Sequence, residues 1–135
     1  MPGETDLKKL LGSMSPELLP GIFVFATLPP GTPIPAGINP VMIFREREGD
    51  TLILLQDEAR AAELPSAFRS RMITLNVHSS LDAVGFLAAV TARLAAAGMG
   101  VNPVSGYFHD HLFVPADRAE EAMAILQALA AENRG

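Results

Sequence analysis

Apolar residues follow two different periods in the middle of the chain, between residues 71 and 97. Within residues 71–77 apolar side chains partly alternate with polar ones, and the run is rich in residues that suit a pleated, half-buried surface. Further on they recur at spacings of three and four, which indicates a helix with one stripe toward a core. The members of that stripe are Leu81, Val84, Leu87, Val90, Leu94 and Ala97. We therefore expect a strand over residues 71–77 and then a helix capped by Ser79 or Ser80.

The pattern continues with two more strands and a closing helix. Gly98 is expected to end the first helix in a left-handed conformation. A strand is expected to start at Met99, and because Pro103 lacks an amide donor, it is short, bulged or at a sheet edge. A turn leads to a third strand at residues 111–114. A final helix is expected at residues 117–131, with Asp117 as its cap.

The first half of the chain contains similar elements around a proline-rich segment. Prolines are so dense from Pro29 to Pro40 that neither a helix nor a strand ladder is compatible with them, and loops of this length are usually functional lids or disordered. The elements expected in this half are a helix at 6–14, a strand at 21–28, that loop, a hairpin at 42–55 with a solvated polar tip at residues 45–50 that contains Gly49-Asp50, a helix at 57–64 and a connector at 68–71.

Composition narrows the class of protein. The 135 residues are 49% hydrophobic and only 19% charged, an apolar surplus that indicates an oligomer, and we expect a homodimer. With a net charge of -5 and scattered basic residues, nucleic acid is not an expected partner. The absence of cysteine excludes disulfides and thiolate chemistry. The sequence has neither the pattern of a signal peptide nor an apolar run long enough for a membrane span, so we expect a cytoplasmic protein without membrane contact.

Two stretches of the second half resemble one known family. The run DAVGFLAAVTARL from Asp82 to Leu94, followed by Gly98 to Asn102, resembles the start of an ACT domain, a regulatory module of βαββαβ order that binds amino acids. The run HDHLFVPADRAEEAMAILQAL resembles its third strand and second helix. The resemblance implies an α+β fold of two tandem ferredoxin-like (ACT-like) halves with antiparallel sheets, at residues 1–68 and 69–135. The second half lacks a fourth strand, so we expect it to borrow one, most plausibly from the first half, and we expect the halves to share strands or to pack their sheets together.

The resemblance also implies where a ligand binds. Backbone amides near Ala83 to Gly85 would take the carboxylate of an amino acid, and Asp82 and Asn102 would hold its ammonium group or side chain. The expected ligand-binding residues are His78, Ser79, Ser80, Asp82, Ala83, Val84, Gly85, Asn102, Val104, Ser105 and Tyr107. Val84 departs from the family pattern, which often has proline there. The alternative is that Ser79, Ser80 and Asp82 only cap the helix.

Other functions are compatible with single features of the sequence. His109 and His111 project from one face of a strand and, with His78, invite a metal site, although pocket lining or turn hydrogen bonds are the favoured roles of His109-Asp110-His111. Tyr107 is equally compatible with ordinary packing. We expect no cofactor and no catalysis, because no nucleophile elbow, phosphate loop or zincin motif is present. A scaffold that binds a protein partner without any ligand is the second hypothesis, and a small metal enzyme is the third.

Overall fold

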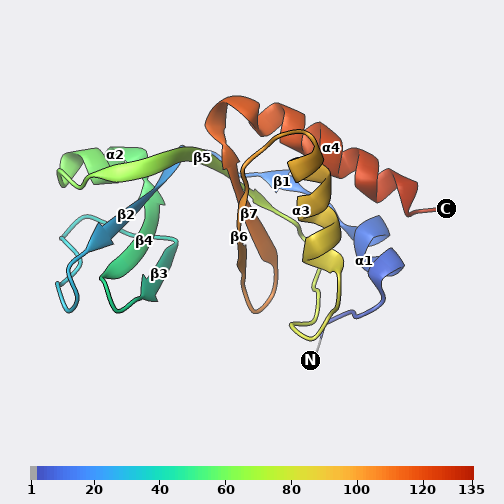
Figure 1. Cartoon of the computed structure of the whole chain (residues 1–135), viewed down its shortest axis with the longest axis horizontal. Helices are drawn as coiled ribbons and strands as arrows, with labels where there is room; N and C mark the ends of the chain where they lie inside the picture. The colour runs from blue at the N-terminus through green and yellow to red at the C-terminus, as the bar shows by residue number, and fades with distance from the viewer. Residues whose placement is uncertain (1–2) are drawn as a thin grey trace. The chain divides into compact units, whose positions relative to one another are not determined.

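Residues 3–135 are described by a computed structural model, and they form two compact units (Figure 1). The terminal unit consists of the described residues up to Pro20 together with Arg71–Gly135. The inner unit is Gly21–Ser70. One strand, β5 (Ser66–Thr74), contributes its first residues to the inner unit and its last four to the terminal unit. The two units therefore share a strand.

The sheet of the terminal unit has the strand order β1-β5-β7-β6. The short strand β1 pairs antiparallel with β5, with Glu17 opposite Thr74, and β6 pairs antiparallel with β7. Because β1 comes from the N-terminal end of the chain, it supplies the fourth strand that the second half lacks, and the prediction of a borrowed strand is confirmed. The elements of this unit are α1 (Leu7–Ser13), β1 (Glu17–Leu18), the end of β5, α3 (Phe86–Ala96), β6 (Asn102–Ser105), β7 (Asp110–Pro115), the 3-10 turn η1 (Ala116–Arg118) and α4 (Ala119–Glu132).

The sheet of the inner unit follows the same plan, in the order β3-β4-β2-β5. Its elements are β2 (Phe23–Leu28), β3 (Met42–Arg45), β4 (Asp50–Leu55), α2 (Gln56–Ala61) and the start of β5. The proline-rich segment between β2 and β3 is a loop, as predicted, and it stands in the chain where the terminal unit has α3. The predicted pair of ferredoxin-like halves is confirmed, with one half missing its first helix.

Each unit buries its own apolar cluster beneath its helices. In the terminal unit α1, α3 and α4 pack together over the sheet, and Val90, Leu94 and Leu126 are fully buried (Figure 1). In the inner unit the buried cluster is smaller and consists of Val24, Ala26, Leu28, Leu52, Leu54 and Ala59, with Ile38 of the proline-rich loop packed against it. Among residues 3–135 no helix is both long and apolar enough to cross a membrane.

The central strand is displaced from its predicted position. We expected residues 71–77 to be the strand and residues 68–71 to be a connector, but β5 begins at Ser66 and ends at Thr74. Its first part pairs with β2 across a register shift between Phe23 and Phe25. Phe68 lies beside this irregularity with a φ of 61°. A non-glycine residue at positive φ interrupts the alternation of side chains, which hid the strand from pattern analysis.

The predicted start of the following helix is wrong by several residues. Neither Ser79 nor Ser80 caps it, because α3 begins at Phe86 after Gly85, whose φ is 89°. Leu81 and Val84, predicted to belong to the buried stripe, are 68% and 85% exposed. The backbone of residues 78–80 is instead paired with the N-terminal segment, which prevents the helix from extending backward.

Among three smaller predictions at element ends, one is wrong, one holds in part and one is confirmed. Asp117 does not cap the last helix, because α4 starts at Ala119 after a 3-10 turn and has no side-chain cap. The polar tip of the first hairpin was expected to be solvated, and residues 45–48 are exposed, whereas Asp50 is only 6% exposed. Gly98 ends α3 with a φ of 75°, as predicted. The domain boundary between residues 68 and 69 stays a prediction, because compact units and sequence domains divide the chain differently.

Candidate functional site

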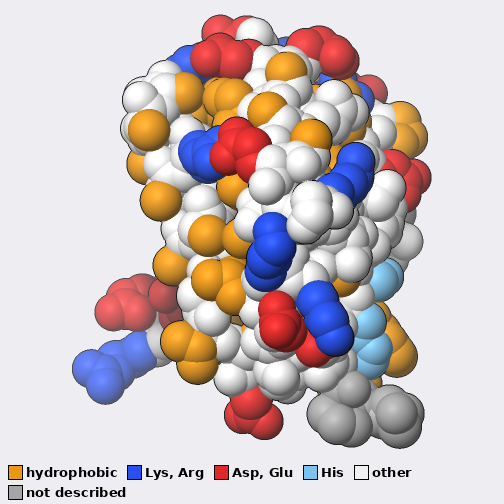
Figure 2. Space-filling model, turned by 90° about the vertical axis from the view of Figure 1, so that its right-hand side faces the viewer, with side chains coloured by type: hydrophobic (Ala, Val, Ile, Leu, Met, Phe, Trp, Pro, Cys, Tyr) orange, Lys and Arg blue, Asp and Glu red, His pale blue; other side chains and the backbone are white. Residues whose placement is uncertain are grey.

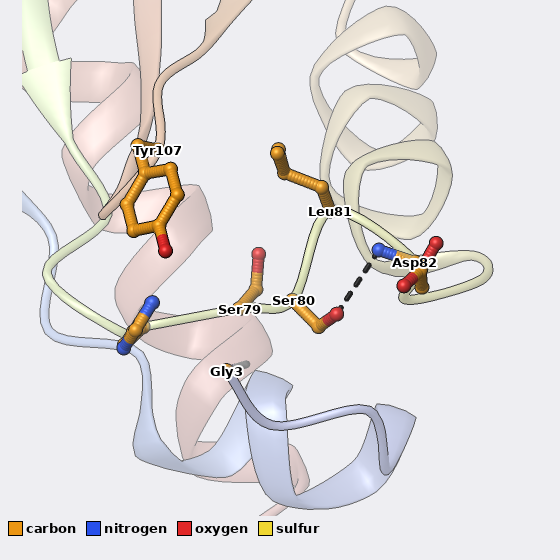
Figure 3. Close-up of a pocket in the computed structure, with 7 residues that line it drawn as sticks. Gly3, Ser79, Ser80, Leu81, Asp82 and Tyr107 are labelled. Atoms are coloured by element: carbon orange, nitrogen blue, oxygen red, sulfur yellow. Dashed lines mark hydrogen bonds between the residues drawn. The ribbon is translucent and has the colours of Figure 1, made fainter. Parts of the chain in front are cut away.

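Two adjoining cavities lie around the loop that joins β5 to α3, and Figure 3 shows the residues that line the first. The first, of about 160 Å³, reaches from this loop to the N-terminal segment and the tip of the β6–β7 hairpin. The second, of about 140 Å³, reaches from the loop to the first turn of α3 and the start of β7. The first is lined by Gly3, His78, Ser79, Ser80, Leu81, Asp82 and Tyr107, and the second by Ser79, Ser80, Leu81, Ala83, Phe86, Leu87, Ser105 and Asp110. Because Ser79, Ser80 and Leu81 line both, this short stretch is the wall between them.

Ser80 organises the loop around itself. Its hydroxyl oxygen accepts a hydrogen bond from the Asp82 amide at 3.0 Å, drawn in Figure 3, and its carbonyl accepts one from the Ala83 amide at 3.0 Å. The Ser80 amide donates to the carbonyl of Glu4 at 3.0 Å. Figure 3 shows the Ser79 hydroxyl directed into the space between Tyr107 and Leu81. The turn thus uses up the amides of Asp82 and Ala83.

Other amides near the second cavity remain free within residues 3–135. The amides of Val84 and Gly85 have no hydrogen-bond partner there, and those of Phe86 and Leu87 belong to the first turn of α3, where a helix leaves its amides unpaired. Phe86 and Leu87 line the second cavity. A helix start of this kind favours negatively charged groups.

Asp110 is a buried carboxylate at the opposite side of the second cavity. The residue is 7% exposed, and the hydroxyl of Ser79 donates to its Oδ2 at 3.2 Å. That is the one hydrogen bond its carboxylate receives from the described residues, and no Lys, Arg or His forms an ion pair with it there. A buried charge without a charged partner is costly.

At the equivalent corner of the inner unit, where the hairpin strand β4 begins, the buried carboxylate does have a positively charged partner. Asp50 begins β4 as Asp110 begins β7, and each lies opposite the last residue of the preceding strand, Arg45 and Ser105 respectively. Both hairpins close with the same bond, from the Glu46 amide to the Gly49 carbonyl and from the Gly106 amide to the His109 carbonyl. In the inner unit Arg45 donates to the carboxylate of Asp50 at 3.3 Å. In the terminal unit the residue at that position is a serine, and both Ser105 and Asp110 line the second cavity.

The three histidines do not converge on a metal site. The Nδ1 atom of His111 lies 3.0 Å from the hydroxyl of Thr74, and Nδ1 of His109 lies 3.4 Å from the carbonyl of Val77. The ring of His78 instead packs near those of Tyr107 and Phe108. Burial lowers the pKa of His111, as does nearby His109, while Asp110 acts in the opposite direction. Nowhere in residues 3–135 do three potential metal ligands of the His, Cys, Asp and Glu type gather.

Several large apolar side chains around the cavities are exposed to solvent. Leu81, Val84, Tyr107 and Phe108 are all more than 60% exposed. Figure 2 shows histidine side chains at one edge of the terminal unit next to hydrophobic ones, whereas charged side chains of both signs are scattered over the rest of that face. No basic patch of the kind that binds nucleic acid gathers on that face.

The structure brings most of the predicted site residues together but not all. Seven of them, His78, Ser79, Ser80, Asp82, Ala83, Ser105 and Tyr107, line one or both cavities. Val84, Gly85, Asn102 and Val104 line neither. Sequence reasoning missed Gly3, Leu81, Phe86 and Leu87 as lining residues, and for Asp110 it favoured pocket lining or turn hydrogen bonds without placing it in the ligand site. Asp110 had a detectable signal, because setting the two hairpin sequences side by side aligns it with Asp50, whereas Gly3 gave no signal at all.

Comparisons with known proteins show which family and fold this chain shares. One ACT domain family model matches residues 2–71, and a second matches residues 67–128. A protein of unknown function from Vibrio cholerae, described as a possible transport protein, is 42% identical, with a TM-score of 0.83 over 92% of this chain and 95% of its own. Among curated proteins no match is found.

More distant solved structures share the fold. A protein from Agrobacterium tumefaciens is 22% identical, with a TM-score of 0.73 over 87% of this chain and 89% of its own. The regulatory subunit of aspartate kinase from Thermus thermophilus, in a ligand-free form, is 14% identical, with a TM-score of 0.63 over 84% of this chain and 95% of its own.

Proposed function

This chain belongs to the ACT domain family, whose members are typically regulatory ligand-binding modules, and on that premise we propose that its terminal unit binds a small amino acid. The proposed site is the second cavity, beside Asp110, with the first cavity as its extension. The chain is proposed to act as a non-catalytic sensor that passes the occupancy of this site to a partner. Such a sensor requires that the ligand bind two states with different affinity.

The observation that carries the proposal is the buried carboxylate of Asp110, which forms no ion pair with any described residue. The matching carboxylate in the inner unit, Asp50, is equally buried and has a guanidinium beside it. The α-ammonium group of an amino acid is a cation small enough for the cavity at Asp110, and Ser79 and Ser105 offer hydroxyl oxygens nearby. Bound there, it would supply the charge that Arg45 supplies in the inner unit.

The rest of the cavity suits the rest of an amino acid. Phe86 and Leu87 line the cavity together with Asp110, and the unpaired amides of their helix turn would attract the ligand carboxylate. The apolar side chains of Leu81, Ala83 and Leu87 offer a surface for an aliphatic side chain. Ligand pockets for larger molecules usually begin at about 300 Å³. Cavities of about 160 and 140 Å³ therefore favour a small, apolar amino acid.

A protein-binding scaffold is the second candidate, and one observation favours it. The edge strand β3 of the inner unit exposes Ile43 and Phe44, and Val41 just before it is also exposed. An exposed apolar edge strand is a surface on which another chain adds a strand. The expected homodimer is proposed on the same grounds. The proposed cytoplasmic location rests on the sequence alone.

Titration of the whole chain with small amino acids and their deaminated analogues tests the proposal. Isothermal calorimetry would compare each amino acid with the α-hydroxy acid of the same side chain, which keeps the carboxylate and loses the ammonium. We expect one or more small aliphatic amino acids to bind, and the hydroxy acid to bind at least about 30-fold more weakly, the factor that corresponds to roughly 2 kcal/mol. Equal binding of both, or no binding of any amino acid at millimolar concentration, would contradict the proposal.

A further inference from the structure

The N-terminal segment is docked against the wall that the two cavities share. The Glu4 amide donates to the carbonyl of His78 at 2.9 Å, and the Glu4 carbonyl accepts from the Ser80 amide at 3.0 Å, so Glu4 and Ser79 form a parallel bridge. Gly3 lies directly on this loop and lines the first cavity (Figure 3). A Cβ atom at Gly3 would come within 2.4 Å of the His78 carbonyl oxygen, so only glycine fits without displacement.

The other end of the segment is fixed to the core. The carboxylate of Glu4 accepts the amides of Thr5 and Asp6, each at 3.0 Å, and the carboxylate of Asp6 caps α1 by accepting the Lys9 amide at 3.1 Å. Leu10 of α1 is fully buried with α3 and α4. A short, internally bonded connection therefore runs from the buried helix α1 to the loop of the candidate site.

We propose that docking of residues 3–5 and occupancy of the cavities are coupled, so that the N-terminal segment reports whether ligand is bound. The coupling rests on the proposed function, because it concerns the ligand of that same site. The same loop takes part in docking the segment and in lining the cavities. The Ser80 amide donates to the Glu4 carbonyl, and Ser79, Ser80 and Leu81 line both cavities. A ligand that favours the docked shape of the loop also favours the docked segment, and the reverse holds by linkage.

The variant Gly3→Ala separates the segment from the loop, and Gly100→Ala is its matched control. Both replace glycine with alanine in the terminal unit, but a Cβ at Gly100 would meet no atom within 4 Å. Amide hydrogen exchange would be followed at Ser80 and Glu4, and amino-acid affinity by calorimetry. We expect Gly3→Ala to speed exchange at Ser80 and to weaken the affinity by about fivefold or more. Gly100→Ala is expected to change neither. In the unaltered chain, bound amino acid should slow exchange at Glu4.

The outcomes distinguish this coupling from the function it rests on. Unchanged exchange at Ser80 in Gly3→Ala would show that the segment does not hold the loop. Faster exchange with unchanged affinity would show that docking and binding are independent, and would leave the ligand site standing. If the unaltered chain binds no amino acid, the proposed function fails and the coupling fails with it, whereas the exchange data still decide whether the segment holds the loop.

Discussion

The hairpin corners of the two units have the same backbone plan and opposite chemistry. In the inner unit Asp50 is neutralised by the guanidinium of Arg45, its cross-strand partner. In the terminal unit Asp110 has Ser105 as its cross-strand partner and a cavity of about 140 Å³ beside it. The cross-strand residue, arginine or serine, therefore distinguishes a corner with an ion pair from a corner with a cavity. A ligand site in one unit can thus be recognised because the equivalent corner of the other unit has a positive charge that the site lacks.

The units also differ in the element that precedes their hairpin. In the terminal unit this element is α3, whose first turn lines the second cavity. In the inner unit it is the proline-rich loop, whose Asn39 amide donates weakly to the carboxylate of Glu58 in α2, at 3.3 and 3.5 Å. The inner unit thus has no helix start at that place in the chain.

The largest expected effect comes from giving the terminal unit the residue of the inner one. In Ser105→Arg the new guanidinium should pair with Asp110 and fill the cavity, as Arg45 pairs with Asp50. We expect amino-acid binding to fall by about 30-fold or more. The free energy of unfolding should rise by no more than about 1 kcal/mol, because the new pair is partly exposed. Calorimetric titration and denaturant unfolding measure the two quantities.

The variant Ser105→Gln is the control for this substitution, because it adds bulk without charge. If charge matters, Ser105→Gln should weaken binding less than Ser105→Arg does. Binding that survives in Ser105→Arg would show that the ligand does not use the corner at Asp110.

A smaller effect on the free energy of unfolding is expected when the pH is lowered, and it arises from a residue of the terminal unit. The pKa of His111 is lowered by burial below its ordinary value of 6.5, so the unfolded chain binds a proton more readily than the folded one. Stability is therefore full above about pH 6.5 and falls as the pH drops from there toward the lower folded pKa. The matching residue of the inner unit is Thr51, which has no charge to gain.

The variant His111→Thr copies that residue into the terminal unit. We expect the loss of unfolding free energy between pH 7 and pH 5 to become smaller in this variant, as measured by denaturant unfolding at each pH. An unchanged pH dependence would assign the effect to other groups.

Much of the fold was predictable because it depends on periods and on special residues. Gly98 ends α3, the prolines prevent regular structure from residue 29 to 40, and the missing fourth strand comes from β1. The failures have local causes that a pattern does not contain. The strand β5 starts before its predicted position, and its first residues were missed because Phe68 within them adopts a positive φ. The helix α3 starts after its predicted position because the loop before it is bonded to Glu4, far away in the sequence.

The candidate site was predictable in place but not in chemistry. The stretch His78 to Ala83 does line the cavities, since a helix start after a strand is where the family resemblance puts a ligand. Asp82 and Asn102 were expected to hold the ligand, but Asn102 lines neither cavity, and Asp110 provides the buried carboxylate. Burial and the absence of a cation are properties of the folded chain. The role of Gly3 depends on its contact with residues 78–80, from which the whole inner unit separates it in the sequence.

The most direct measurement compares amino-acid affinity in Asp110→Asn and Asp50→Asn by calorimetric titration of the whole chain. Both variants remove one buried carboxylate from the start of a strand in a hairpin. If Asp110 holds the ammonium group, Asp110→Asn should weaken binding by about 30-fold or more, and Asp50→Asn should leave it within about twofold of the unaltered chain. The central claim is that the terminal unit binds its ligand through the carboxylate of Asp110, whose counterpart Asp50 in the inner unit is already paired with Arg45. Equal affinities in the two variants would contradict that claim.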